Sequence, residues 1–114
     1  MTRGRIVLVP FPFDDLSTSK ARPALCLTDP MGPHNHVVLS FISSRIPTDL
    51  LDTDMVISTS HPDFHSTGLR VSSTIRLHRL MTVTTGLIQR GLGELSSQLK
   101  AEVEVKLRKL FLLR

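Results

Sequence analysis

The stretch "RIVLVPFPFDDLSTSKARPALCL", residues 5–27, sets two apolar runs on either side of a polar segment. The first run is rich in β-branched residues and then meets prolines, which cannot donate to a ladder. It therefore predicts a strand over about Ile6–Val9 that leaves its sheet at Pro10. The polar middle, "DDLSTSKAR", holds turn formers, hydroxyls and charges and predicts a loop. The second run, "ALCL" at 24–27, predicts another strand, so that Arg22 would stand at the mouth of a strand that forms core.

Further apolar runs follow at short intervals along the chain. They predict strand segments at 37–43, 54–58, 72–83 and 87–95. Prolines and glycines mark the turns between them, and Gly91 or Gly93 marks a turn or a bulge. Strands of this length and spacing are typical of a small barrel. We expect one domain over residues 1–114, with the barrel over about 4–95.

The C-terminal segment changes to a helical period and predicts an amphipathic helix over about 97–113, capped by Ser96 or Ser97. Its apolar stripe consists of Leu99, Val103, Leu107, Leu110 and Leu113. The pairs Glu102–Lys106 and Glu104–Arg108 have the favourable spacing for ion pairs on a helix. Val105 and Leu112 project away from the stripe, so we expect a partner to cover them, with ordinary surface exposure as the alternative.

Composition favours a basic protein of a reducing compartment and argues against a membrane-spanning or exported one. With 14 Lys and Arg against 10 Asp and Glu, the formal net charge is +4, which favours polyanionic partners. The single cysteine, Cys26, lies in an apolar run, which predicts a buried, unreactive thiol and fits a reducing cytoplasm. No apolar stretch approaches the roughly 18 residues that span a bilayer, and none resembles a signal peptide, so a soluble, unexported protein is expected.

Two histidine pairs raise the question of a metal site. His34 and His36 lie two residues apart, and His61 and His65 lie four apart, spacings at which imidazoles can share an ion. Neither pair has a cysteine or a clear third ligand beside it. We expect solvated loop histidines, no metal and no other cofactor.

Cations and hydroxyls gather at the predicted strand ends. In "TIRLH", residues 74–78, strand alternation places Arg76 and His78 on one face, with apolar residues on the other. If Arg22 and Ser43 come from neighbouring strand ends, the group contains two fixed cations, a hydroxyl and one titratable base. That combination suits a phosphodiester better than other common substrates.

These segments carry a resemblance to a known family. In order, "IVLVPFPF" with its Ser-rich loop and "RPAL", then "FISS", "SSTIRLHRLMTV" and "GLGEL", resemble the pattern of the MazF/PemK family of toxin endoribonucleases. The resemblance extends over nearly the whole chain. It implies a mainly β fold, an SH3-like small β-barrel with a C-terminal helix. It also implies a cytoplasmic homodimer that cleaves single-stranded RNA without metal and is neutralised by a cognate antitoxin.

The resemblance also implies roles for individual residues. Arg22 matches the arginine before Pro-Ala and would hold the scissile phosphate, and Ser43 stands where many members have a threonine. Arg76 matches an arginine of some PemK-like members, and His78 replaces the aspartate of those members. The catalytic set expected is therefore Arg22, Ser43, Arg76 and His78.

RNA binding is expected from further polar residues. The loop before Arg22 would supply Ser17, Ser19 and Lys20 to close over the RNA, and Ser44 and Ser73 would add hydroxyls at the strand ends.

The reaction that the resemblance implies is attack by the ribose 2′-hydroxyl on the adjacent phosphorus. His78 is the best acid or base for it, because arginine does not give up its proton.

Two other functions stay open on the sequence alone. A CcdB-like toxin shares the fold and binds gyrase instead of cutting RNA, but it is expected to end in a Trp-Gly-Ile-like tail, whereas this chain has no Trp and ends "FLLR". A catalytically weak or dead RNA-binding barrel is the other alternative. The scarcity of aromatic residues, which limits base stacking, argues against a purely binding role.

Overall fold

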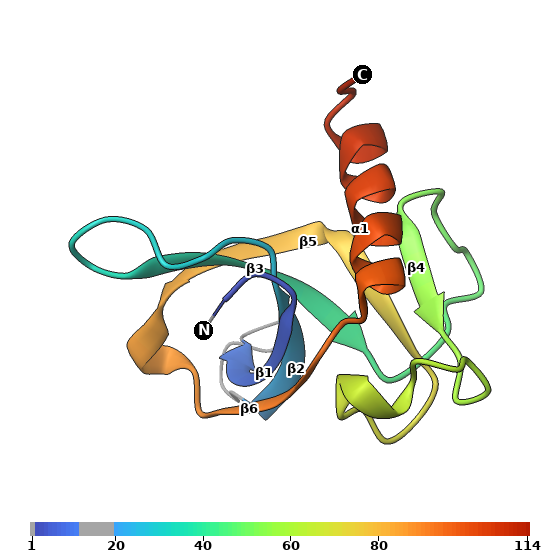
Figure 1. The fold of residues 1–114 in the computed structure, drawn as a ribbon, viewed down its shortest axis with the longest axis horizontal. Coiled ribbons are helices and arrows are strands. Elements are labelled where there is room, and N and C mark those ends of the chain that lie inside the picture. The colour runs from blue at the N-terminus through green and yellow to red at the C-terminus, as the bar shows by residue number, and fades with distance from the viewer. Residues whose placement is uncertain (1, 12–19) are drawn as a thin grey trace.

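The computed structural model describes residues 2–11 and 20–114, and within them six strands form one sheet followed by a single α-helix. The strands are β1 Arg5–Phe11, β2 Lys20–Cys26, β3 His36–Ser43, β4 Asp54–Ile57, β5 Ser73–Thr84 and β6 Arg90–Glu94, and the helix is α1 Ser97–Leu110. Short 3₁₀ turns occur at His65–Thr67 and Thr85–Leu87. All strand pairs are antiparallel, in the order β4-β5-β3-β2-β1-β6. This half-barrel with a C-terminal helix, drawn in Figure 1, confirms the predicted fold class.

The sheet buries apolar side chains on both faces, because it curls around one of them. On β2, Leu25 belongs to a cluster that includes Leu99 and Val103 of α1. Its neighbours Ala24 and Cys26 belong to a second cluster, on the other face. Strand alternation therefore separates a face covered by α1 from the inner face of the half-barrel.

The first two strands are longer than the sequence predicts. β1 continues through Pro10 to Phe11, where Pro10 pairs with Ala21. β6 pairs only with residues 5–8, so one side of β1 is unpaired beyond Leu8, and a proline is tolerated there. The prediction that the sheet ends at Pro10 is therefore wrong, and β2 starts at Lys20 within the predicted loop.

A bulge occurs where glycines mark one in the sequence. Ile6 pairs with Gly93 and Val7 with Gly91, so the register shifts by one residue. A Cβ at Gly93 would lie 2.3 Å from the carbonyl oxygen of Ser66, so only glycine allows the loop to approach β6 so closely.

The helix begins where predicted and ends three residues early, at Leu110 instead of 113. Ser96 is the cap, and its Oγ accepts from the Leu99 backbone N–H at 3.2 Å. Of the two expected ion pairs, Arg108 lies 3.4 Å from Glu104, whereas Lys106 donates to the carbonyl of Asp52 at 2.7 Å. No helix in the described residues has the length and apolar composition needed to cross a membrane.

Candidate active site

Four strands bring the predicted residues to one face of the sheet. A row of directly opposite residues consists of Ala24 on β2, Phe41 on β3, Arg76 on β5 and Asp54 on β4. Opposite residues of antiparallel strands point to the same face, and Arg22, two residues before Ala24, points there too. Because neighbouring residues of these strands pack on the α1 side, the row lies on the face away from the helix. We call it the site face.

A buried carboxylate lies at the centre of the contacts on this face. The Asp54 side chain has no exposed surface, and its Oδ1 lies 2.9 Å from Arg76 Nε and 3.9 Å from His78 Nδ1. The Arg76 N–H does not point at Oδ1 closely enough for a hydrogen bond, so the contact is an ion pair. Oδ2 accepts from the Leu51 backbone N–H at 2.8 Å. Arg76 and His78 thus both lie beside one carboxylate oxygen, a partner that the sequence does not predict, on the face where strand alternation places them.

A large bulge in β5 places His78. Phe41 pairs with Arg76, but the preceding residue of β3, Ser40, pairs with Leu80, so the ladder register skips Leu77, His78 and Arg79. The buried Ser40 Oγ donates to the Arg76 carbonyl at 2.9 Å and so holds the edge of the bulge. A bulge bends a strand and re-aims its side chains, which here directs His78 to Asp54 across the face.

Arg22 and Ser43 lie at the open end of the site face. The β2–β3 ladder ends at Ala24–Phe41, just before both residues, and the Arg22 side chain is exposed. With strands about 4.8 Å apart and about 3.3 Å per residue, the Cα atoms of Arg22 and Arg76 are about 12 Å apart. Two arginines at that separation can approach one phosphodiester from both sides. Ser43 is half-buried, and its Oγ accepts from the Arg45 backbone N–H at 3.1 Å.

The residues expected to bind RNA divide into three groups. Lys20 and Ser44 are exposed near the open end of the site face. Ser73 is only 2% exposed and donates to the Val71 carbonyl at 2.8 Å, so its hydroxyl serves the fold. Ser17 and Ser19 lie outside the described residues.

Sequence reasoning missed three residues of this face. The sequence predicts only that Asp54 begins a strand, and an acidic residue at a strand start is usually exposed. Phe41 and Arg79 also belong to the face, with the Arg79 guanidinium carbon 5.0 Å from the centre of the Phe41 ring, within cation–π range. The alternation in "FIS" predicts that Phe41 and Ser43 share a face, and this signal could have identified Phe41.

The other titratable groups take simpler roles. His61 Nδ1 accepts from the Asp63 backbone N–H at 3.0 Å and so stabilises its own loop. Within residues 2–11 and 20–114, no group of three or more His, Cys, Asp or Glu could hold a metal ion. Cys26 is 1% exposed, and this burial raises the pKa of its thiol to about 11.

The family follows from a sequence model that matches residues 2–111, described as the PemK-like, MazF-like toxin of type II toxin–antitoxin systems. The chain belongs to this family. The matched range includes every strand of the site face and the whole of α1, so the buried Asp54 and its two neighbours lie inside the toxin domain.

Solved structures of this toxin family share the fold at low sequence identity. The Mycobacterium tuberculosis toxin MazF-mt6 superposes with a TM-score of 0.72 at 20% identity, covering 96% of this chain and 98% of that one. A mycobacterial endoribonuclease in complex with its cognate antitoxin gives 0.72 at 15% identity, covering 100% and 97%. MazE–MazF from Deinococcus radiodurans gives 0.68 at 18% identity, covering 100% and 97%. No curated protein sequence matches the chain significantly.

Proposed function

We propose that the chain is an endoribonuclease toxin that cleaves single-stranded RNA without a metal ion. The observation that carries the proposal is the meeting of Arg76 and His78 at one buried carboxylate, on a face that also bears Arg22. Together these residues provide permanent positive charge and one group that can accept and release a proton. Phosphodiester cleavage requires both.

The reaction fits these groups. The ribose 2′-oxygen attacks the adjacent phosphorus and loses its proton to a base, while the bond from phosphorus to the 5′-oxygen breaks and that oxygen gains a proton. The products are a 2′,3′-cyclic phosphate and a free 5′-hydroxyl. DNA lacks the 2′-hydroxyl and is spared.

Each residue receives a role in this proposal. His78 transfers the proton, Arg22 and Arg76 stabilise the charge added to the phosphate, and Ser43 orients the substrate. Exposed Lys20 and Ser44 bind the RNA backbone at the open end of the face. Ser17 and Ser19 keep the role that the sequence suggests for them, closure over the RNA.

Asp54 is a positioning residue in this scheme. Its side chain is fully buried and cannot touch RNA, but it contacts both Arg76 and His78. At 3.9 Å, its contact with His78 is longer than a hydrogen bond, and such contacts often tighten when substrate binds. A carboxylate beside Nδ1 favours the tautomer that leaves Nε2 free to accept the 2′-hydroxyl proton.

The biological setting follows the family. Residues 1–114 act as a single toxin domain, a cytoplasmic homodimer that inhibits growth by cutting RNA. A cognate antitoxin protein neutralises it, in line with the family description and the complexes of its structural neighbours.

One experiment tests the function directly. Purified protein is incubated with a long single-stranded RNA in EDTA, and the ends of the products are mapped. Cleavage with cyclic phosphate and 5′-hydroxyl ends, lost in Arg22→Ala, is the expected result. Intact RNA at high protein concentration would overturn the proposal and favour a binding barrel. A protein that spares RNA but binds a gyrase subunit would instead be a CcdB-like toxin.

A further inference from the structure

The hairpin that joins β2 to β3 carries a histidine pair that the proposed RNA chemistry does not use. Its tip is the segment "MGPHNH", residues 31–36, which projects beyond the end of the sheet in Figure 1. Met31 adds a thioether to the imidazoles of His34 and His36. The tip therefore offers three metal ligands, although no three His, Cys, Asp or Glu side chains gather in the described part of the chain.

The backbone places Met31 beside His36. The Met31 N–H donates to the His36 carbonyl at 2.8 Å, and the His36 N–H donates to the Met31 carbonyl at 2.9 Å. Two residues that exchange both hydrogen bonds form a directly opposite antiparallel pair. Their side chains lie on the same face, with Cβ atoms about 4.5 to 5.5 Å apart. The thioether and the imidazole can therefore reach the same ion.

A tight turn holds the tip in this shape. The Asn35 N–H donates to the Gly32 carbonyl at 3.2 Å, and Pro33 stands at the second position of the turn, where its fixed φ fits. Gly32 and Asn35 have φ angles of +72° and +51°, a region that glycine adopts freely and asparagine tolerates. The Asn35 carbonyl also accepts from the Thr85 N–H at 3.0 Å. The tip is thus ordered before any ligand binds, which lowers the entropy cost of binding.

The two imidazoles have a separation that one shared ion allows. The ring centroids of His34 and His36 are 5.8 Å apart. With a metal–nitrogen distance of about 2.0 Å, each centroid lies about 3.2 Å from the ion, so two imidazoles on one ion have centroids about 5 to 6.4 Å apart. Within residues 2–11 and 20–114, neither ring makes a hydrogen bond or an ion pair, and both residues are exposed, as is Met31. The ligand atoms are open to an ion from solvent.

The kinds of ligand favour a soft ion. Thioether sulfur selects Cu(I), and imidazole also binds copper. Hard cations such as Mg²⁺ and Ca²⁺ prefer oxygen ligands, and residues 31–36 contain no carboxylate.

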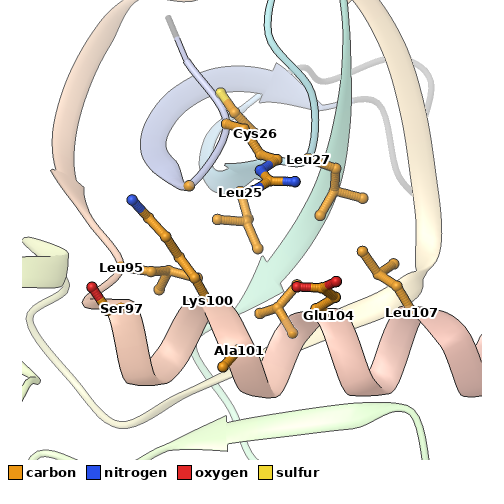
Figure 2. A pocket seen from close by; sticks show the side chains of 12 residues that line it. Leu25, Cys26, Leu27, Leu95, Ser97, Lys100, Ala101, Glu104 and Leu107 are labelled. Carbon is orange, nitrogen blue, oxygen red and sulfur yellow. The ribbon is translucent and has the colours of Figure 1, made fainter.

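The single cysteine does not compete for such an ion. Cys26 is 1% exposed, and burial raises the pKa of its thiol to about 11, so the thiol stays protonated. Figure 2 shows Cys26 at the end of β2, beside the groove that this strand forms with α1. The thioether of the hairpin is therefore the accessible soft ligand.

We propose that Met31, His34 and His36 form a binding site for a Cu(I) ion. This differs from the expectation of solvated loop histidines, because the sequence spacing does not show that Met31 lies opposite His36. His36 is seven residues from Ser43 along β3, or about 20 Å at 3.3 Å per residue, so the ion lies away from the site face. The proposal goes beyond RNA cleavage and does not depend on it, and the ion takes no part in that reaction.

The first test uses Ag⁺, which has the charge and ligand preference of Cu(I) and is not oxidised in air. The full chain, labelled with ¹³C in its methionine methyl groups, is titrated with silver nitrate in chloride-free buffer and followed by NMR. We expect the Met31 methyl resonance to shift until one ion is bound per chain. The methyl resonance of Met55, which is 3% exposed, should not move. An unchanged Met31 resonance would overturn the proposal.

Calorimetry with Ag⁺ measures the contribution of each ligand. Met31→Leu and His36→Asn should each weaken binding by about tenfold or more, because even residues that only support a metal ligand contribute about 10-fold to 100-fold. The matched control is His65→Asn, the same change on an exposed histidine of another loop. It should leave the affinity within about twofold, as expected for a distant, independent site. Equal affinity of Met31→Leu and the wild-type chain would overturn the proposal.

Cu(I) itself is added in the absence of oxygen. It should compete with Ag⁺ and give the same shift at Met31, and a failure to compete would contradict the choice of ion. RNA cleavage in EDTA is measured for the wild-type chain and for Met31→Leu, and the two rates should agree. A chain that cuts RNA but does not bind Ag⁺ contradicts only the hairpin site, whereas a chain that binds Ag⁺ but spares RNA contradicts only the proposed function.

Discussion

Replacing Asp54 by Asn removes the buried charge that Arg76 and His78 share while keeping the size of the side chain. The effect on stability follows from the ion pair. Removing one partner of a buried pair costs about 3 to 5 kcal/mol. Arg76 retains 19% exposure and can recover some hydration, so the lower end applies. We expect a loss of about 3 kcal/mol, equivalent to a fall of about 10 to 20 °C in Tm for a domain of this size.

The effect on rate has a different cause. A positioned acid or base contributes about 10² to 10⁴ in rate, and His78 without its carboxylate is less well oriented. We expect the single-turnover rate at saturating RNA to fall by about 10²-fold, equal to about 2.7 kcal/mol of barrier. RNA affinity should change little, because the Asp54 side chain is fully buried.

Stability and rate are measured on the same preparations. Urea unfolding is followed by circular dichroism, because the chain has no Trp or Tyr. Cleavage is measured below the unfolding transition. Asp49→Asn, the same change on an exposed residue of the preceding loop, serves as the matched control and should alter neither quantity. If Asp54 acts through His78, Asp54→Asn should add little to the loss already caused by His78→Ala.

A clear result would refute this reasoning. If Asp54→Asn loses stability but cleaves RNA within about threefold of the wild-type rate, the charge has no part in positioning and Asp54 is a structural residue only. Full additivity with His78→Ala would show that the two residues act independently.

Arg22→Ala should abolish cleavage with little loss of stability, because the side chain is exposed, and Arg22→Lys should not restore the rate, because a point charge lacks the planar fork. A lysine variant with near wild-type cleavage would exclude a phosphate clamp. Burial raises the pKa of Cys26 from 9.0 to about 11, so the native thiol should resist iodoacetamide at pH 8 and react on unfolding. Because the unfolded thiol loses its proton at a lower pH than the buried one, the free energy of unfolding should be unaffected by this group below pH 9. It should fall as the pH rises from 9 toward 11, which alkaline unfolding curves should show. Val105 and Leu112 are 62% and 89% exposed, as expected for residues that a partner covers. If a second copy of the chain covers them, replacing both with Ser should weaken self-association. An unchanged sedimentation coefficient would contradict this prediction.

Alternation along the strands was the most reliable signal in the sequence. It correctly separates Ile75 and Leu77, which are fully buried, from Arg76 and His78 on the other face. The signal is local, because the faces of a strand are fixed by the backbone of that strand alone. The apolar stripe predicted for α1 is correct as far as Leu110 for the same reason. Leu113 is exposed because it lies beyond the end of the helix.

The contacts between strands could not be predicted in this way. Asp54 reaches Arg76 because β4 pairs with β5 in one register, and register depends on segments far apart in sequence. The bulge at Leu77–Arg79 contains no glycine from which it could be predicted, unlike the bulge at Gly91–Gly93. The centre of the candidate site therefore depends on two non-local features, whereas its individual residues were visible in the sequence.

His78 occupies a position where both the residue type and the contact with a neighbouring strand matter. PemK-like members are expected to carry an aspartate there, and His78 stands 3.9 Å from a carboxylate that comes from the adjacent strand. In His78→Asp, two carboxylates would face each other beside Arg76, and like charges at that distance oppose ionisation of both. We therefore expect His78→Asp alone to cleave RNA poorly, and the double variant His78→Asp with Asp54→Asn, which has one carboxylate again, to cleave faster. The measurement is the cleavage rate of both variants across pH 5 to 8. If His78→Asp alone is the faster of the two at every pH, the two positions do not share one carboxylate role.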